Sequence, residues 1–173
     1  CDMGAVGEPH FKTWHGEWYD FHGECDLVLV HAPDYAAGLG LWIHIRTKIR
    51  YDYSYIESAA IRIGEETLEV ASFGTYFVNG VSQAAMPTTI SGFFVNHTET
   101  KQGKEHVFTI ETGKRTSISV KSFKGMVSVL LNTKGGYGPE MLADFQDSVG
   151  LTGSMRTGKK LARDGVTVIE DLN

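Results

Sequence analysis

Three histidines and an aspartate lie close together near the start of the chain, and such residues can hold a metal ion. They are His10, His15, Asp20 and His22. Three imidazoles bind zinc or copper when a fold brings them together. The spacings of five and seven residues match no helical or hairpin ligand pattern, however. The interpretation of these histidines as surface residues at the start of a strand is therefore favoured over a metal site.

Four basic side chains alternate along segment 41–50 and would share one face of a strand. They are His44, Arg46, Lys48 and Arg50. We call them the basic stripe. Such a row can hold a sulfated or otherwise anionic glycan, so the basic stripe is the candidate ligand surface of the chain. A solvated strand face with Trp42 at one end is the competing interpretation, because charged residues mostly lie in water.

The sequence contains no motif that pairs a nucleophile with a base. A nucleophile elbow, a phosphate loop, a His-Glu-x-x-His zinc motif and a Cys-x-x-Cys pair are all absent from it. A glycan-processing enzyme would need two convergent carboxylates, and the sequence singles out no such pair. Trp14, Trp18 and Trp42 suit either a sugar-stacking platform or a buried β core, of which the core is favoured. We therefore expect a protein without enzymatic activity.

A dense block of aromatic, histidine and turn residues occupies positions 8–25, and two shorter motifs follow it. The block reads Glu8-Pro9-His10-Phe11-Lys12-Thr13-Trp14-His15-Gly16, then Tyr19-Asp20-Phe21-His22-Gly23-Glu24-Cys25. The later motifs are Val78-Asn79-Gly80-Val81 with Met86-Pro87, and Gly150-Leu151-Thr152-Gly153. In this order, over nearly the whole chain, they resemble the von Willebrand factor type D domain family.

The resemblance implies a calcium site, which several substitutions in this chain would weaken. An aspartate that binds calcium in the family falls on His15, whose nitrogen a hard cation disfavours. Calcium takes six to eight oxygen ligands. The remaining candidates are Asp164, Ser154 and Asp171. The expectation is therefore no cofactor, with calcium at these residues as the alternative.

The resemblance also bears on Cys1 and Cys25, the two cysteines of the chain. Cysteines at these positions pair with downstream partners in the family, and Thr152 replaces one of those partners here. Cys1 and Cys25 are therefore predicted to bond to each other.

Asn96-His97-Thr98 fits the N-glycosylation signal, which matters if the chain is secreted.

The family resemblance, and not the residue patterns, suggests a role. It implies a non-catalytic adhesion or structural module within a larger secreted or cell-surface protein, with other extracellular proteins or glycans as partners. The alternative is a recognition domain that binds a carbohydrate or calcium.

The candidate residues must be positioned by the secondary structure of the chain, which contains short runs of alternating apolar residues separated by turn residues. Leu41–Arg50 separates its residues into two faces, as a half-buried strand does. Asn79-Gly80 favours a tight type I′ hairpin. The other predicted strands are Phe11–His15, Cys25–Ala32, Tyr55–Ile63, Thr67–Phe73, Thr75–Val78, Val81–Gln83, Thr88–Ile90, Gly92–Thr98, Glu105–Glu111, Ser117–Phe123 and Met126–Asn132.

The pattern predicts an all-β fold of two packed antiparallel sheets. A short helix is expected from Pro139, because Met141, Leu142 and Phe145 follow it at helical spacing. The C-terminal segment after Val149 should be irregular.

Length and composition fit one globular domain over residues 1–173. Hydrophobic residues make up 42% and charged residues 21% of the chain, which excludes a disordered or fibrous protein. The net charge of −5 lacks the basic surplus of a nucleic-acid-binding protein. No run approaches the roughly 18 apolar residues of a membrane span.

Overall fold

Strand β5 (Leu41–Arg50) shows how the sequence pattern produces a sheet. Ile43 and Ile45 are buried, whereas the alternating Arg46 is exposed. Successive side chains of a strand point to opposite faces, so one face of β5 packs into the core and the other meets water.

The computed structural model describes residues 3–6, 9–100, 102–113, 116–133, 139–162 and 164–170.

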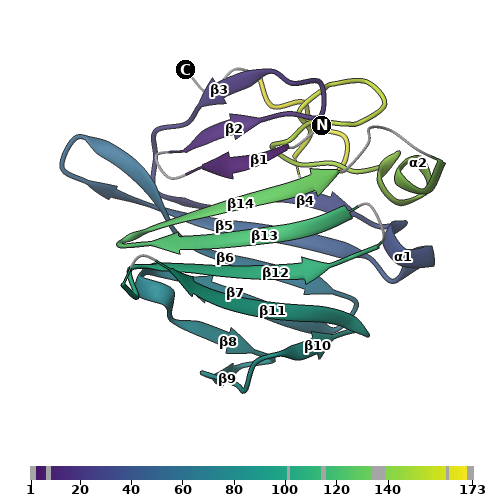
Figure 1. The fold of residues 1–173 in the computed structure, drawn as a ribbon. Coiled ribbons are helices and arrows are strands. Elements are labelled where there is room, and N and C mark those ends of the chain that lie inside the picture. Colours follow the sequence, from purple (N-terminus) through teal and green to yellow (C-terminus); the bar gives the residue numbers. More distant parts are fainter. Residues whose placement is uncertain are drawn as a thin grey trace.

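The described residues form two antiparallel sheets that pack face to face (Figure 1). The larger sheet has the order β10-β11-β12-β13-β14-β1-β2-β3, and the smaller has the order β4-β5-β6-β7-β8-β9. The strands of the larger sheet are β1 (Met3–Val6), β2 (His10–Lys12), β3 (Trp18–Asp20), β10 (Thr88–Ile90), β11 (Phe93–Thr100), β12 (Glu105–Glu111), β13 (Thr116–Phe123) and β14 (Met126–Thr133). The remaining strands of the smaller sheet are β4 (Cys25–Ala32), β6 (Tyr53–Ile63), β7 (Glu66–Ala71), β8 (Tyr76–Val78) and β9 (Val81–Ser82).

Three short helical segments complete the described elements. They are α1 (Tyr35–Gly38), the 3₁₀ turn η1 (Ser72–Gly74) and α2 (Pro139–Phe145). The helix predicted from Pro139 is confirmed, and its Met141 and Phe145 are buried. No helix among the described residues has both the length and the apolar content needed to cross a bilayer.

The core lies between the two sheets and consists of aliphatic and aromatic side chains from their facing sides. Ile61 of the smaller sheet and Phe108, Val120 and Val129 of the larger sheet are all essentially inaccessible to solvent. Burial of each such side chain stabilises the fold by about 1.5–3 kcal/mol. The predicted all-β fold of two packed antiparallel sheets is thus confirmed.

Turn chemistry shortens the first predicted strand. Phe11–His15 was expected to be extended, but β2 ends at Lys12 because Gly16 has φ of +80° and its N–H donates to Thr13. Trp14 then turns inward and is buried.

The predicted Asn79-Gly80 turn is confirmed, since both residues have positive φ, at 50° and 78°.

The hairpin that joins β5 and β6 extends past the end of the larger sheet, at the left of Figure 1. The register of the two strands shifts between Arg46 and Thr47, because Glu57 is an extra residue in β6. Beyond the shift, Ile49 is 54% exposed, although it falls in the same alternation as the buried Ile43 and Ile45. The apolar side chain of Ile49 therefore meets water at this hairpin.

The C-terminal segment after α2 is irregular, as predicted, and it lies against the edge of β4. Isolated bridges join His31 to Val149, Gly150 to Leu161, and Leu161 to Val168. In Figure 1 these yellow loops lie beside β1, β2 and β3.

Candidate functional site

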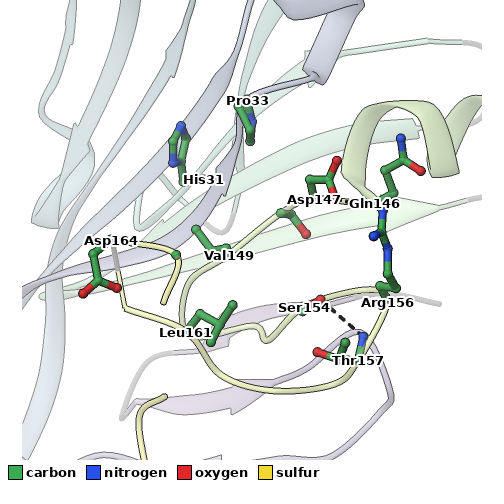
Figure 2. Close-up of a pocket in the computed structure, with 12 residues that line it drawn as sticks. His31, Pro33, Gln146, Asp147, Val149, Ser154, Arg156, Thr157, Leu161 and Asp164 are labelled. Carbon is green, nitrogen blue, oxygen red and sulfur yellow. Dashed lines mark hydrogen bonds and ion pairs between the residues drawn. The ribbon is translucent and has the colours of Figure 1, made fainter. Parts of the chain in front are cut away.

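A cleft of about 420 Å³ lies where the end of β4 meets the C-terminal loops (Figure 2). β4 contributes His31, the segment after α2 contributes Asp147 and Ser148, and the loops contribute Arg156 and Asp164. The lining mixes charged, polar and apolar groups, which is the composition of many ligand sites.

Backbone hydrogen bonds hold one wall of the cleft in place. His31 and Val149 exchange N–H···O bonds of 2.8 and 2.9 Å, and the N–H of Leu151 donates to Val28 at 3.1 Å. β4 is the edge strand of its sheet, so this segment satisfies backbone groups that would otherwise be unpaired.

Gly150 is required at the point where this wall crosses β4. Its φ is +123°, and a Cβ added there would lie 2.6 Å from the carbonyl oxygen of Leu29. Real Cβ atoms do not approach backbone oxygens so closely. Glycine is therefore the residue that lets the segment approach the strand.

The same segment is hydrogen bonded to the N-terminal strands. The N–H of Trp14 donates to the carbonyl of Thr152 at 3.1 Å, and the Tyr19 hydroxyl donates to the carbonyl of Leu151. His15 Nε2 lies 3.1 Å from the carbonyl oxygen of Met155. Burial raises the pKa of Tyr19 well above its usual range, which keeps this phenol protonated and able to donate. These contacts bring together residues 14–19 and 150–155, two of the three segments that carry the family resemblance.

The cleft contains one polar group without a protein partner. The Ser148 side chain is 1% exposed, and its hydroxyl has no hydrogen-bond partner among the described residues. A buried unpaired hydroxyl costs about 1–3 kcal/mol. Because Ser148 lines the cleft, a bound polar group could remove that cost.

Charged groups at the rim are paired with each other. Arg156 and Asp147 form an ion pair of 2.9 Å, and both side chains are about half exposed. Such surface pairs contribute little to stability, so either member can exchange its partner for a ligand. The His31 ring stacks on Trp42 with centroids 3.5 Å apart, which sets the orientation of the imidazole.

Of the predicted calcium ligands, the structure places Ser154 and Asp164 on this same cleft (Figure 2). Asp164 Oδ1 accepts the N–H groups of Val166 and Thr167 at 2.9 and 2.8 Å. The Thr167 hydroxyl and these amides lower the pKa of Asp164. The Ser154 hydroxyl accepts the Thr157 N–H at 3.3 Å, drawn as a dashed line in Figure 2.

Both candidate ligands thus stabilise turns of their own loops. Within the described part of the chain, no group of three or more His, Cys, Asp or Glu side chains is arranged to hold a metal. These residues therefore do not fit the six to eight oxygens of a calcium ion. Asp171 lies outside the described residues.

The histidines near the N-terminus do not converge. His10 Nδ1 lies 2.5 Å from Asp20 Oδ1 across β2 and β3, His15 contacts Met155, and His22 is exposed. The tryptophans likewise share no platform. Trp14 is buried, Trp18 is exposed on β3, and Trp42 lies on β5 in the other sheet. The interpretation as core aromatics is therefore right for Trp14 and wrong for Trp18.

The basic stripe is largely paired with carboxylates. Arg46 binds Asp26 through two hydrogen bonds of 2.6 and 3.2 Å, and Lys48 lies 3.3 Å from Glu24. Asp26 accordingly has a lowered pKa, chiefly through its hydrogen bond to Arg46. These pairs reduce the positive charge that the basic stripe offers to an anionic ligand. His44 contacts the Trp42 ring, and Arg50 reaches the β5–β6 turn.

Two modification sites remain predictions. Cys25 is exposed and its thiol is free in the structure, whereas Cys1 lies outside the described residues. The disulfide between them stays a prediction. Asn96 is exposed on β11 opposite Thr109, where an attached glycan would point to solvent.

Sequence reasoning did not single out Asp147, Ser148 or Arg156. No local motif marks them, because they come together through the long-range contact of the C-terminal segment with β4.

Comparison of the chain with models of protein families gives no match, and comparison with curated proteins gives none.

Proposed function

We propose that this chain is a non-catalytic extracellular recognition module of the von Willebrand factor type D class, with a role in adhesion or matrix assembly. Two of the three segments that resemble this family meet in space through the bonds of Trp14, His15 and Tyr19 to residues 151–155. This convergence supports the proposal, because a family signature is expected to specify one part of a fold.

The observation that carries the proposed role is the chemistry of the cleft. It offers an exchangeable Asp147–Arg156 pair at the rim and the unpartnered Ser148 hydroxyl within. Neither the Ser148 nor the Ser154 hydroxyl is bonded to an imidazole within the described residues. The cleft can therefore bind a polar, charged segment of another protein, whereas it lacks the nucleophile–base contact of acyl-transfer enzymes.

Binding to a panel of immobilised extracellular-matrix proteins tests the proposal. Arg156→Glu should abolish binding to any protein captured by the wild-type chain, because it places two like charges at the rim. Arg46→Glu is the matched control, since Arg46 is also an exposed arginine paired with an aspartate. Equal loss in both variants would show that the cleft is not the binding site. Turnover of an ester, amide or glycoside substrate by the purified chain would refute the non-catalytic role.

Carbohydrate recognition is a second candidate function. It is favoured by a separate pocket with aromatic and cationic lining at the far end of β5.

A further inference from the structure

A pocket of about 290 Å³ lies between two hairpins at the end of the sheets opposite to the cleft. The β5–β6 hairpin contributes Arg50, Tyr53 and Tyr55, and the β13–β14 hairpin contributes Phe123 and Lys124. β5 runs from Leu41 beside the cleft-lining end of β4 to Arg50 at this pocket, so its length separates the two sites. Both hairpin turns lie at the left of Figure 1.

Two exposed aromatic side chains lie next to residues that line the pocket. Tyr51, in the β5–β6 turn, is 81% exposed, and Phe73 of η1 is 72% exposed. Phe73 belongs to the same surface because its N–H donates to the carbonyl of Lys124 at 2.8 Å. A Cβ added at Gly125, which lines the pocket, would lie 3.6 Å from the Phe73 ring. Large exposed aromatic groups gathered in one place mark binding surfaces.

The backbone holds these residues in an unfavourable conformation. Tyr51, Phe73 and Lys124 have φ values of 57°, 61° and 52°, a region that favours glycine and asparagine. Residues with larger side chains occupy such positions at a cost in free energy. These three residues belong to three turns from different parts of the chain. Each turn places a large or charged side chain near one pocket in spite of the unfavourable backbone conformation.

The cations of the pocket are available to a ligand. The Arg50 guanidinium lies 5.7 Å from the Tyr51 ring, and Lys124 Nζ lies 5.4 Å from the Phe123 ring. Neither cation forms an ion pair within the described part of the chain, in contrast to Arg46 and Lys48 of the basic stripe. The pocket therefore combines aromatic faces with two positive charges that form no ion pair with a carboxylate of the described residues.

We propose that this pocket binds an acidic sugar unit, a carboxylated or sulfated pyranose, within a glycan. A pyranose ring has an apolar C–H face that stacks on an aromatic ring, and its hydroxyl edge can bond to the phenols of Tyr53 and Tyr55. Its anionic group would pair with Arg50, whose planar guanidinium matches a carboxylate or sulfate, and with Lys124. A bilayer surface is the weaker fit, because it would contact the projecting rings and leave the concave pocket unused.

Calorimetric titration of the full chain with defined oligosaccharides tests this site. The probes are a heparin hexasaccharide, a hyaluronan hexasaccharide and the neutral cellohexaose. We expect one or both acidic probes to bind, with affinity that falls as salt rises, and cellohexaose to bind at least tenfold more weakly. The double variant Arg50→Gln/Lys124→Gln should weaken acidic binding by about tenfold or more, because it removes two charge-assisted contacts. Tyr53→Leu should also weaken binding while the net charge is unchanged.

The double variant Arg46→Gln/Lys48→Gln is the matched control. It removes two cations from the basic stripe, and so changes the net charge by the same amount, but it leaves the pocket intact. Equal weakening by the two double variants would overturn the proposal in favour of diffuse electrostatic attraction. Absence of acidic binding, or equal binding of cellohexaose, would also overturn it. So would binding to phosphatidylserine vesicles without oligosaccharide binding, which would indicate a membrane surface. Thermal melting of each variant checks that it remains folded.

The pocket is independent of the cleft and of the matrix-protein binding proposed for it. Arg156→Glu should leave acidic-glycan binding unchanged, and the Arg50→Gln/Lys124→Gln variant should leave matrix-protein binding unchanged. The two proposals can therefore fail separately.

Discussion

His97 of β11 and His106 of β12 are hydrogen bonded to each other, with His97 Nε2 3.0 Å from His106 Nδ1. Their rings are nearly parallel, at 12°, and the Phe108 ring also stacks on His97. His106 also packs against Gly74, where an added Cβ would lie 2.3 Å from the imidazole. When only one of the two facing nitrogens carries a proton, its N–H donates to the other nitrogen. When both carry a proton, the two N–H groups point at each other and repel.

We predict that this pair makes stability depend on pH. Burial, and then the charge of His106, lower the pKa of His97 from its ordinary value of 6.5, while Glu99 acts in the opposite direction. The unfolded chain therefore binds this proton more readily than the folded chain. The contribution to stability is complete above pH 6.5 and is lost as the pH falls toward the folded-state pKa. Denaturant unfolding between about pH 7.5 and 5 should show the decline.

Replacement of the titrating group tests the assignment to His97. His97→Gln keeps a polar side chain but cannot bind the proton, so the free energy of unfolding should fall less steeply over this interval. An unchanged slope in the variant would assign the pH dependence to other groups.

Ser148 and Ser122 are both fully buried, but removal of their hydroxyls should have opposite effects. Ser148→Ala removes a hydroxyl that has no partner among the described residues, so the free energy of unfolding should rise by about 1 kcal/mol. Ser122 accepts the Gly74 N–H at 3.0 Å and donates to the carbonyl of Ala71 at 3.1 Å. Ser122→Ala should therefore destabilise the fold by about 1–3 kcal/mol. Urea denaturation measures both, and loss of stability in Ser148→Ala would contradict the assignment.

Gly150→Ala should be severely destabilising, because its Cβ would meet the backbone of β4 at 2.6 Å. Backbone atoms of a paired strand cannot easily shift, so we expect a loss of about 3 kcal/mol or more. Gly16→Ala is the control. Gly16 also has positive φ, at +80°, but nothing lies within 4 Å of an added Cβ. Its loss should be limited to backbone strain of about 1 kcal/mol. Equal losses in thermal or urea unfolding would show that the close approach at Gly150 is not decisive.

Calcium should not stabilise this chain through Asp164 and Ser154. Their oxygens accept hydrogen bonds from their own loops, so they do not form a preorganised cation site. We expect the same melting temperature in excess calcium and in excess chelator. A ligand at 100 times its dissociation constant would add about 2.7 kcal/mol, which a melting experiment detects readily. A calcium-dependent rise that Asp164→Asn abolishes would restore the predicted site.

Local sequence patterns were sufficient to predict the strands whose two faces meet different environments. β4, β5, β10 and β12 begin and end where the sequence analysis placed them. Their alternating residues carry that information locally, as the Asn79-Gly80 turn does through its tolerance of positive φ. The helix from Pro139 was also predictable, because its start residue and apolar spacing lie within seven positions.

Tertiary structure alone decided which residues meet. β1 pairs with β14 across more than a hundred residues, and no pattern within Met3–Val6 specifies that partner. The cleft brings Ser148 and Arg156 together with His31 of β4 in the same way. The pairing of Arg46 and Lys48, but not Arg50, with carboxylates likewise follows from the strand that lies beside each. Strand periodicity depends on neighbours along the chain, whereas sites depend on contacts between distant segments, and only the packed fold brings those segments together.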